Sequence, residues 1–161
     1  MLTRPATNTD LPAALDVWRL ANAARGKHVS PARIADVSAK LRAADSLVAV
    51  TVDVDEVVAM AVGVPAREDD GDGAPVPGLC HVAMVFVRPD RWGRGVGGAV
   101  LRGLADTAAA TGYTRLQLWT GESNVRAQRL YLRHGFTATG RVTRHNGEAI
   151  GHYTADLPLG G

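Results

Sequence analysis

Residues 85–98 read VFVRPDRWGRGVGG, and they say more about the fold than any other part of the chain. An apolar run ends at a proline, a glycine-rich loop follows, and residues 95–111 have the alanine-rich composition of a helix. Glycines at 93, 95, 97 and 98 allow backbone angles that other residues avoid, and Arg91 and Arg94 stand beside them. Because N–H groups at a helix N-terminus bind anions, the loop is predicted to cradle a pyrophosphate.

Two other phosphate-binding motifs fit this loop less well. The Gly-Lys-Ser/Thr end of a P-loop is absent from it. Gly93, Gly95 and Gly98 match the letters of the dinucleotide fingerprint, but the N-terminal half of the chain lacks the repeated βαβ units of that fold. A nicotinamide-binding domain stays open as an alternative, and so does a glycine-rich turn that binds nothing.

Outward from the loop, the spacing of apolar residues predicts a mixed α/β domain. Residues 65–78 hold three prolines, three glycines and four acidic residues, and they are expected to form a mobile loop whose charges could attract a cation. An Asn146-Gly147 turn should join the last two strands. The remaining predicted elements are strands at 2–5, 46–52, 57–64, 79–87, 114–119, 136–142 and 148–157, and helices that begin at Asp10 and Ser30 or span 95–111 and 124–134.

Length and composition indicate one domain over residues 1–161. The net charge of +2 is too small to suggest a nucleic-acid partner. A single cysteine, Cys80, gives no sign of an oxidising compartment. No signal peptide or membrane span is expected, so the predicted location is the cytoplasm. His81, His145 and His152 lack metal-ligand spacing, and no metal site is predicted.

A second segment, residues 124–136, reads NVRAQRLYLRHGF. Asn124 suits a helix N-cap or a ligand contact, and Gly135 suits the end of the helix. Ala127, Leu130 and Tyr131 are three and four residues apart, which places them on one helix face.

Together the two segments resemble the GCN5-related N-acetyltransferase (GNAT) superfamily. In that family a Q/R-x-x-G-x-G/A loop between a strand and a helix binds the pyrophosphate of coenzyme A, and a later helix carries a tyrosine near the sulfur. Trp92 stands where the pattern has Gln or Arg, a departure that leaves the backbone cradle intact. The resemblance covers residues 79–136 firmly. It implies a single-domain GNAT fold, with a mostly antiparallel mixed sheet, splayed strands and about four flanking helices.

The resemblance also implies a site for acetyl-CoA as the acyl donor. Tyr131 matches the general acid that protonates the departing thiolate, although a tyrosine that only packs the helix against the sheet is the structural alternative. The implied donor-binding residues are Val85, Phe86, Val87, Trp92, Gly93, Arg94, Gly95, Val96, Gly97, Gly98, Asn124 and Tyr131.

His81 is the candidate for the base that takes the amine proton. Some family members carry a glutamate at this place, six residues before the position of Val87. Strand alternation would put His81 on the same face as Val85 and Val87, and histidine titrates in the required range. A structural histidine and a water chain acting as the base both stay open. Glu122 could attract a cationic amine or simply be a solvated loop carboxylate.

The implied activity is transfer of an acetyl group to a primary amine of a small molecule, such as an antibiotic or metabolite. A protein or peptide amine, a longer acyl-CoA, and an acyl-CoA sensor without turnover are the alternatives. Dimers are common in the family, so a homodimer is compatible with the resemblance. The sequence does not name the acceptor.

Overall fold

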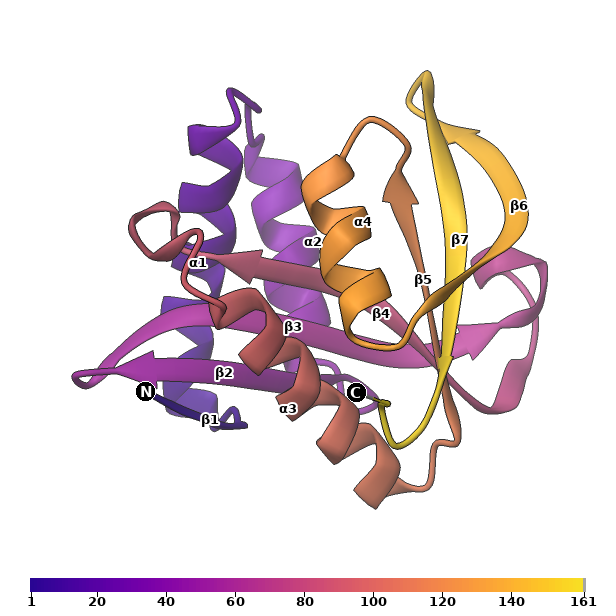
Figure 1. Ribbon diagram of the computed structural model, residues 1–161. Coiled ribbons are helices and arrows are strands. Elements are labelled where there is room, and N and C mark those ends of the chain that lie inside the picture. The colour runs from indigo at the N-terminus through magenta and orange to yellow at the C-terminus, as the bar shows by residue number, and fades with distance from the viewer. Residues whose placement is uncertain (161) are drawn as a thin grey trace.

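Figure 1 shows a computed structural model of the chain, which describes residues 1–160 except for the side chain of Asp70. Within the described residues, seven strands form one sheet in the order β1-β2-β3-β4-β5-β7-β6. Of the strand pairs described, only β4–β5 is parallel, so the predicted mostly antiparallel mixed sheet is confirmed. The strands are β1 Leu2–Pro5, β2 Leu47–Asp53, β3 Glu56–Arg67, β4 Pro75–Val87, β5 Arg115–Gly121, β6 Thr137–His145 and β7 Glu148–Asp156.

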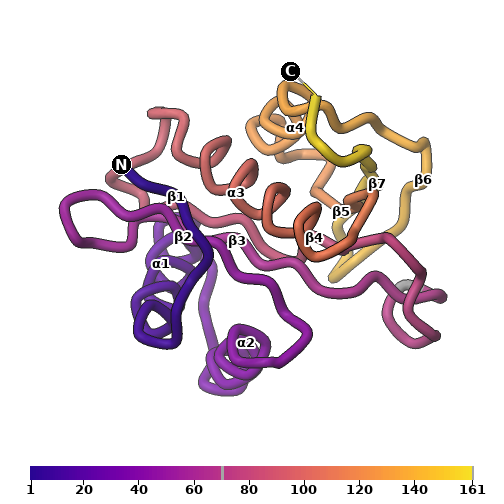
Figure 2. The backbone as a smooth tube through the Cα atoms, turned by 90° about the horizontal axis from the view of Figure 1, so that it is seen from below, coloured from indigo at the N-terminus to yellow at the C-terminus, as the bar shows by residue number. Residues whose placement is uncertain are grey.

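In the part of the chain that the structure describes, four α-helices cover the two faces of the sheet: α1 Leu11–Ala24, α2 Pro31–Arg42, α3 Val96–Thr111 and α4 Val125–Arg133. In Figure 2, α1 and α2 lie on one side of the strands and α3 and α4 on the other. Two apolar clusters match this layering. One surrounds Leu101 and Leu104 of α3, and the other surrounds Trp18 of α1 and Met60 of β3. None of the described helices is long and apolar enough to cross a membrane.

The prediction for residues 65–78 was wrong at both of its ends. β3 continues to Arg67 and β4 begins at Pro75, with a short 3-10 helix at Glu68–Gly71 between them. Prolines are tolerated here because β2 pairs with β3 only as far as Gly63, so Pro65 lies past the end of its neighbour on that side. Pro75 is the first residue of its strand, another position that needs no ladder donor.

The sheet splays between β4 and β5. Across the described chain these strands pair over three positions only, Leu79–His81 against Arg115–Gln117. Beyond them β4 stays paired with β3 as far as Val87, and β5 stays paired with β7 as far as Gly121. The facing edges of residues 82–87 and 118–121 therefore offer backbone groups to a ligand instead of to each other.

A bulge in β4 corrects the predicted direction of His81. Val62 pairs with Met84 but Gly63 pairs with Val82, so Ala83 is an extra residue in β4. An extra residue reverses the alternation of faces. Val85 and Val87 accordingly pack in the apolar cluster around Leu101 and Leu104 of α3. His81 lies on the opposite face of the sheet, where it lines a cavity together with residues of α2. The predicted common face of His81, Val85 and Val87 was wrong.

A bidentate ion pair fixes the entry to α1. Arg4 Nη1 and Nη2 lie 2.6 and 3.1 Å from the two carboxylate oxygens of Asp10, which also accepts from the Thr7 backbone N–H at 2.7 Å. The Arg4 hydrogen bond lowers the pKa of Asp10 from 3.8 to about 2, and the Thr7 bonds act in the same direction. The carboxylate is thus favoured in the folded chain, so its contribution is present above pH 4 and is lost as the pH falls toward 2.

We expect Asp10→Asn to lower the free energy of unfolding at pH 7 by about 1 kcal/mol, because the pair is partly exposed. The loss relative to wild type should shrink as the pH falls below 4, when denaturant unfolding is measured at several pH values. Asp16→Asn is the control, since Asp16 is exposed and lies 3.7 Å from Arg19. Equal losses for the two variants would contradict the assignment.

Candidate active site

The glycine loop forms a left-handed turn at the start of α3. Gly93 and Gly95 have φ angles of 76° and 77°, a region that only glycine enters easily. The first intrahelical bond runs from the Ala99 N–H to the Gly95 carbonyl at 3.2 Å, so the N–H groups that precede Ala99 lie outside the helical ladder. These groups gather at the positive end of the helix dipole, which suits an anion.

One aromatic and one cationic side chain, Trp92 and Arg126, hold this loop in place. The Trp92 indole N–H donates to the Val87 carbonyl at 2.8 Å, which closes the turn between β4 and α3. The Arg126 guanidinium of α4 lies 5.7 Å from the centre of the Trp92 ring. A Cβ added at Gly93 would lie 3.5 Å from Arg126 Nη2, so this cation borders the loop. The sequence does not reveal Arg126 as a neighbour of the loop, because only tertiary packing brings α4 to it.

Of the two arginines predicted to flank the phosphate, one has a structural role. Arg91 Nε lies 3.3 Å from Asp53 Oδ2 and its Nη1 lies 2.9 Å from Asp90 Oδ2, which ties the loop to β2. Arg94 is exposed between the two left-handed glycines. Arg94 and Arg126 are therefore the cations placed to meet an anion at the loop.

Tyr131 of α4 is buried, with 9% of its surface exposed. Its ring packs 5.6 Å from Phe136 and in the same apolar cluster as Val85 and Val87. Burial raises the pKa of Tyr131 to about 12, partly offset by the charge of Arg25. The phenol consequently keeps its proton at neutral pH and can donate it. Phe86 points to the other face of β4 and packs against the apolar cluster around Trp18 and Met60.

The turn before α4 is held by capping bonds. The Asn124 side chain accepts from the Ala127 N–H at 3.1 Å, so the predicted N-cap is confirmed. Ser123 donates to Glu148 Oε1 at 3.0 Å, and Gln128 Nε2 donates to the carbonyls of Gly121 and Glu122. This bonding fixes the end of β5 and the start of α4 against each other.

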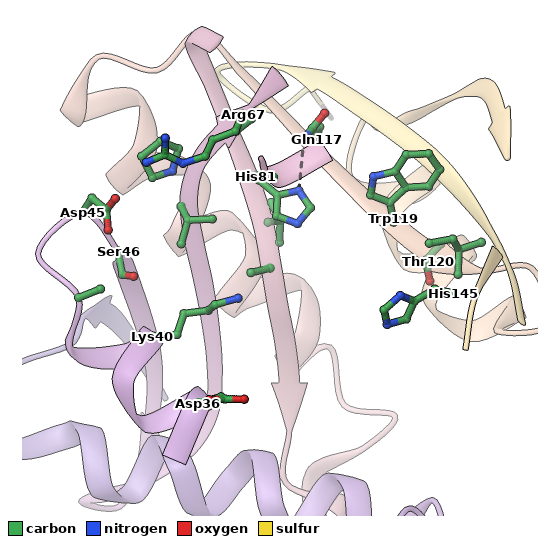
Figure 3. A pocket seen from close by; sticks show the side chains of 18 of the residues that line it. Asp36, Lys40, Asp45, Ser46, Arg67, His81, Gln117, Trp119, Thr120 and His145 are labelled. Atoms are coloured by element: carbon green, nitrogen blue, oxygen red, sulfur yellow. Dashed lines mark hydrogen bonds between the residues drawn. The ribbon is translucent and has the colours of Figure 1, made fainter. Parts of the chain in front are cut away.

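A cavity of about 960 Å³ opens on the α2 face of the splayed strands. His81 lies at its floor, with Gln117 and Trp119 of β5 beside it (Figure 3). Cationic and acidic side chains both line its walls. Among the residues whose side chains the structure describes, the charged or titratable ones that line it besides His81 are Asp36, Lys40, Asp45, Arg67, Arg144 and His145. Trp119 and His145 also border the cavity.

A chain of hydrogen bonds leads from the cavity floor into the protein. Gln117 Nε2 lies 3.3 Å from His81 Nδ1, and Gln117 Oε1 lies 2.9 Å from His152 Nε2. His152 Nδ1 in turn lies 2.9 Å from Thr139 Oγ1. Gln117 and His152 are buried, with 8% and 5% of their surfaces exposed. No group of His, Cys, Asp or Glu among residues that the structure describes is arranged to hold a metal ion.

The structure has close relatives in shape among solved structures. Ribosomal-protein-S18-alanine N-acetyltransferase from Escherichia coli superposes with a TM-score of 0.76 at 21% identity, covering 99% of this chain and 96% of that one. An acetyltransferase from Kribbella flavida gives 0.75 at 24%, covering 97% of each chain. Aminoglycoside 6'-acetyltransferase type Ii gives 0.76 at 16%, again covering 97% of each. At these identities the likeness concerns the fold alone.

Sequence comparison reaches the level of the family. No curated protein sequence matches the chain. The profile of the family described as "Acetyltransferase (GNAT) family" matches residues 14–136, which is well over half of the chain and includes both the glycine loop and α4. The chain therefore belongs to the GNAT acetyltransferase family.

Proposed function

We propose that this protein is an acetyl-CoA-dependent N-acetyltransferase that acts on a primary amine of a small molecule by direct attack in a ternary complex. One observation carries the proposal: the sheet splays between β4 and β5 next to the glycine loop, and the cavity around His81 opens onto the same strands. A donor held at the loop and an acceptor held in the cavity would then meet at the gap in the sheet.

The donor site suits coenzyme A in charge and in shape. The pyrophosphate would lie on the N–H groups of residues 93–98, with Arg94 and Arg126 as counter-charges. The pantetheine arm would run along the unpaired edge of β4 at Val85, Phe86 and Val87. A phosphate can come close to the backbone at Gly93 and Gly95, because these exposed residues have no side chain.

The reaction needs one proton removed and one supplied. The neutral amine nitrogen forms a bond to the thioester carbon, and the carbon–sulfur bond breaks. His81, or a water chain that it supports, takes the proton that the amine loses. The Tyr131 phenol supplies a proton to the departing thiolate, which its pKa of about 12 allows at neutral pH. Backbone N–H groups at the edges of the gap are the available donors to the oxyanion.

The charges of the cavity narrow the class of acceptor. Among the described lining residues, Lys40, Arg67 and Arg144 are cationic and Asp36 and Asp45 are acidic. An amine that also carries a carboxylate or another anionic group would therefore find partners of both signs there. The volume and the Trp119 ring suit a small molecule rather than an extended protein surface.

Release of free thiol from acetyl-CoA in the presence of an amine panel tests the proposal. The panel should contrast amines that carry a carboxylate with polycationic amines and with short peptides, and mass spectrometry should confirm the acetylated product. Binding of acetyl-CoA without turnover on any amine would indicate a sensor. Absence of binding by calorimetry would overturn the donor site itself.

Arg126→Gln should weaken the binding of coenzyme A about tenfold, because it removes a charge-assisted contact from the edge of the loop. Calorimetric titration measures the change, and a smaller dependence of affinity on salt concentration should accompany it. Arg115→Gln is the matched control, since Arg115 begins β5 and pairs with Asp156. An equal loss of affinity in both variants would mean that the effect comes from the change in net charge and not from a contact at the loop.

A further inference from the structure

The hydrogen-bond chain behind His81 raises the question of which ring nitrogen of that histidine carries the proton. A neutral imidazole donates at one nitrogen and accepts at the other. The side chain amide of Gln117 is the link between His81 and His152, and its two ends differ, since one only donates and the other only accepts. The orientation of this amide is therefore coupled to the tautomers of both histidines.

Two orientations of the amide give complete chains. With Nε2 toward His81, as the distances above describe, His81 Nδ1 accepts and its neutral ring carries the proton on Nε2. A half-turn about the last side-chain torsion exchanges the two ends. Oε1 then accepts from His81 Nδ1–H. In this tautomer Nε2 of His81 is unprotonated and can take up a proton.

Backbone groups at the far end of the chain favour the second orientation. The Arg141 N–H donates to Thr139 Oγ1 at 3.3 Å, and the Thr139 hydroxyl reaches the His152 carbonyl at 3.3 Å. A carbonyl can only accept, so the single hydroxyl hydrogen is directed there. Thr139 Oγ1 must then accept from His152 Nδ1, which leaves His152 Nε2 as an acceptor for the Gln117 amide N–H.

This end of the hydrogen-bond chain lies at an irregularity in the pairing of β6 with β7. The register between β6 and β7 shifts between Ala138 and Val142, so His152 lies opposite the interruption. Thr139 lies in the interrupted segment and its side chain replaces the missing ladder bond. His152 is also packed against the Trp119 ring, with centroids 4.8 Å apart.

We propose that Gln117 is a positioning residue that fixes His81 in the Nδ1–H tautomer, with Oε1 of its amide toward His81. In this role Gln117 does not touch the substrate. It keeps Nε2 of His81 as the proton acceptor and holds the Nδ1–H of the imidazolium after the amine proton has been taken up. This inference rests on the proposed function only in the use it gives to His81, because the tautomer itself exists in the protein without substrates.

The experiment is nitrogen NMR of the full chain labelled with ¹⁵N-histidine, at a pH where the rings are neutral. Long-range proton–nitrogen correlations distinguish protonated from unprotonated ring nitrogens. The chain has five histidines, and His81→Gln and His152→Gln identify two of them by the signals that disappear. Wild type should show the proton on Nδ1 in both rings. A proton on Nε2 of His81 in wild type would overturn the proposal.

Two substitutions distinguish a positioning role of Gln117 from a general effect of this side chain on folding. Gln117→Leu should return His81 to a mixture of tautomers and lower kcat about tenfold, in line with the reduced population of the competent form. Gln117→Glu accepts at both ends, so His81 should keep its proton on Nδ1 while His152 moves its proton to Nε2. That opposite response is not expected from a change that only loosens the core, and its absence would count against the link.

The same measurements distinguish the two levels of the proposal. If His81 carries its proton on Nδ1 but no amine is acetylated, the acetyltransferase proposal fails and the role of Gln117 in the hydrogen-bond chain stands. If turnover occurs and Gln117→Leu changes neither the tautomer nor kcat, the acetyltransferase stands and the positioning role is wrong.

Discussion

Tyr131→Phe is expected to lower kcat about 10²-fold or more while leaving the affinity for coenzyme A within about twofold of wild type. The substitution removes only the phenol proton donor. The ring that packs 5.6 Å from Phe136 is retained, so the thermal midpoint should change little. Steady-state kinetics with the best amine of the panel, together with calorimetry for donor binding, measures both quantities.

Tyr113→Phe is the matched control for this experiment. Tyr113 is partly buried against the same apolar cluster as Tyr131, but it follows the C-terminus of α3, away from the glycine loop. Its loss of a hydroxyl should leave kcat unchanged. A Tyr131→Phe enzyme with full turnover would show that the thiolate leaves without a protein acid, and Tyr131 would then be a packing residue.

The pH dependence carries a second check on the same residue. Since the pKa of Tyr131 is about 12, the phenol is protonated across the range from pH 7 to pH 10. Ionisation of Tyr131 should therefore cause no fall in kcat in that range. A loss of activity near pH 9 that disappears in Tyr131→Phe would contradict the burial of this side chain.

The parts of the fold that sequence reasoning reached are those fixed by local chemistry. Gly95 at the start of α3 and Gly112 at its end have positive φ angles, as does Gly135 after α4. The turn at Asn146 and Gly147 has φ angles of 50° and 79°, as the residue pair predicts. Each of these depends on the residue itself and on its immediate neighbours, so one sequence is enough to reveal it.

The features that the sequence did not reveal depend on partners far along the chain. Ala83 carries no mark of a bulge, because the register of β4 is set by its pairing with β3. The bulge alone places the His81 side chain on the face of the sheet opposite to the predicted one. The role of Gln117 likewise requires β4, β5 and β7 to lie side by side in the order that the sheet gives them. Arg126 reaches the glycine loop only through the packing of α4.

Gly98→Ala is expected to destabilise the folded chain by about 2 kcal/mol, because the site has no room for a methyl group. A Cβ at Gly98 would lie 2.4 Å from Nε2 and 2.9 Å from Cε1 of His134. This ring is buried, with 7% of its surface exposed, and its Nδ1 lies 3.4 Å from Arg102 Nη1. Burial, followed by the charges of Arg102 and Arg133, lowers the pKa of His134, so the ring is neutral at pH 7 and is held by packing.

The adjacent glycine provides the control that isolates this contact. A Cβ at Gly97 would meet Leu130 at 3.5 Å, an ordinary distance, so Gly97→Ala should be neutral or slightly stabilising, as expected of alanine in a helix. His134→Ala should restore part of the stability of Gly98→Ala, since it removes the atoms that clash. Denaturant unfolding of the two single variants and the double variant measures this coupling. Additive losses would mean that the contact between Gly98 and His134 is not what keeps α3 and the glycine loop against α4, and the close approach of the two helices would need another cause.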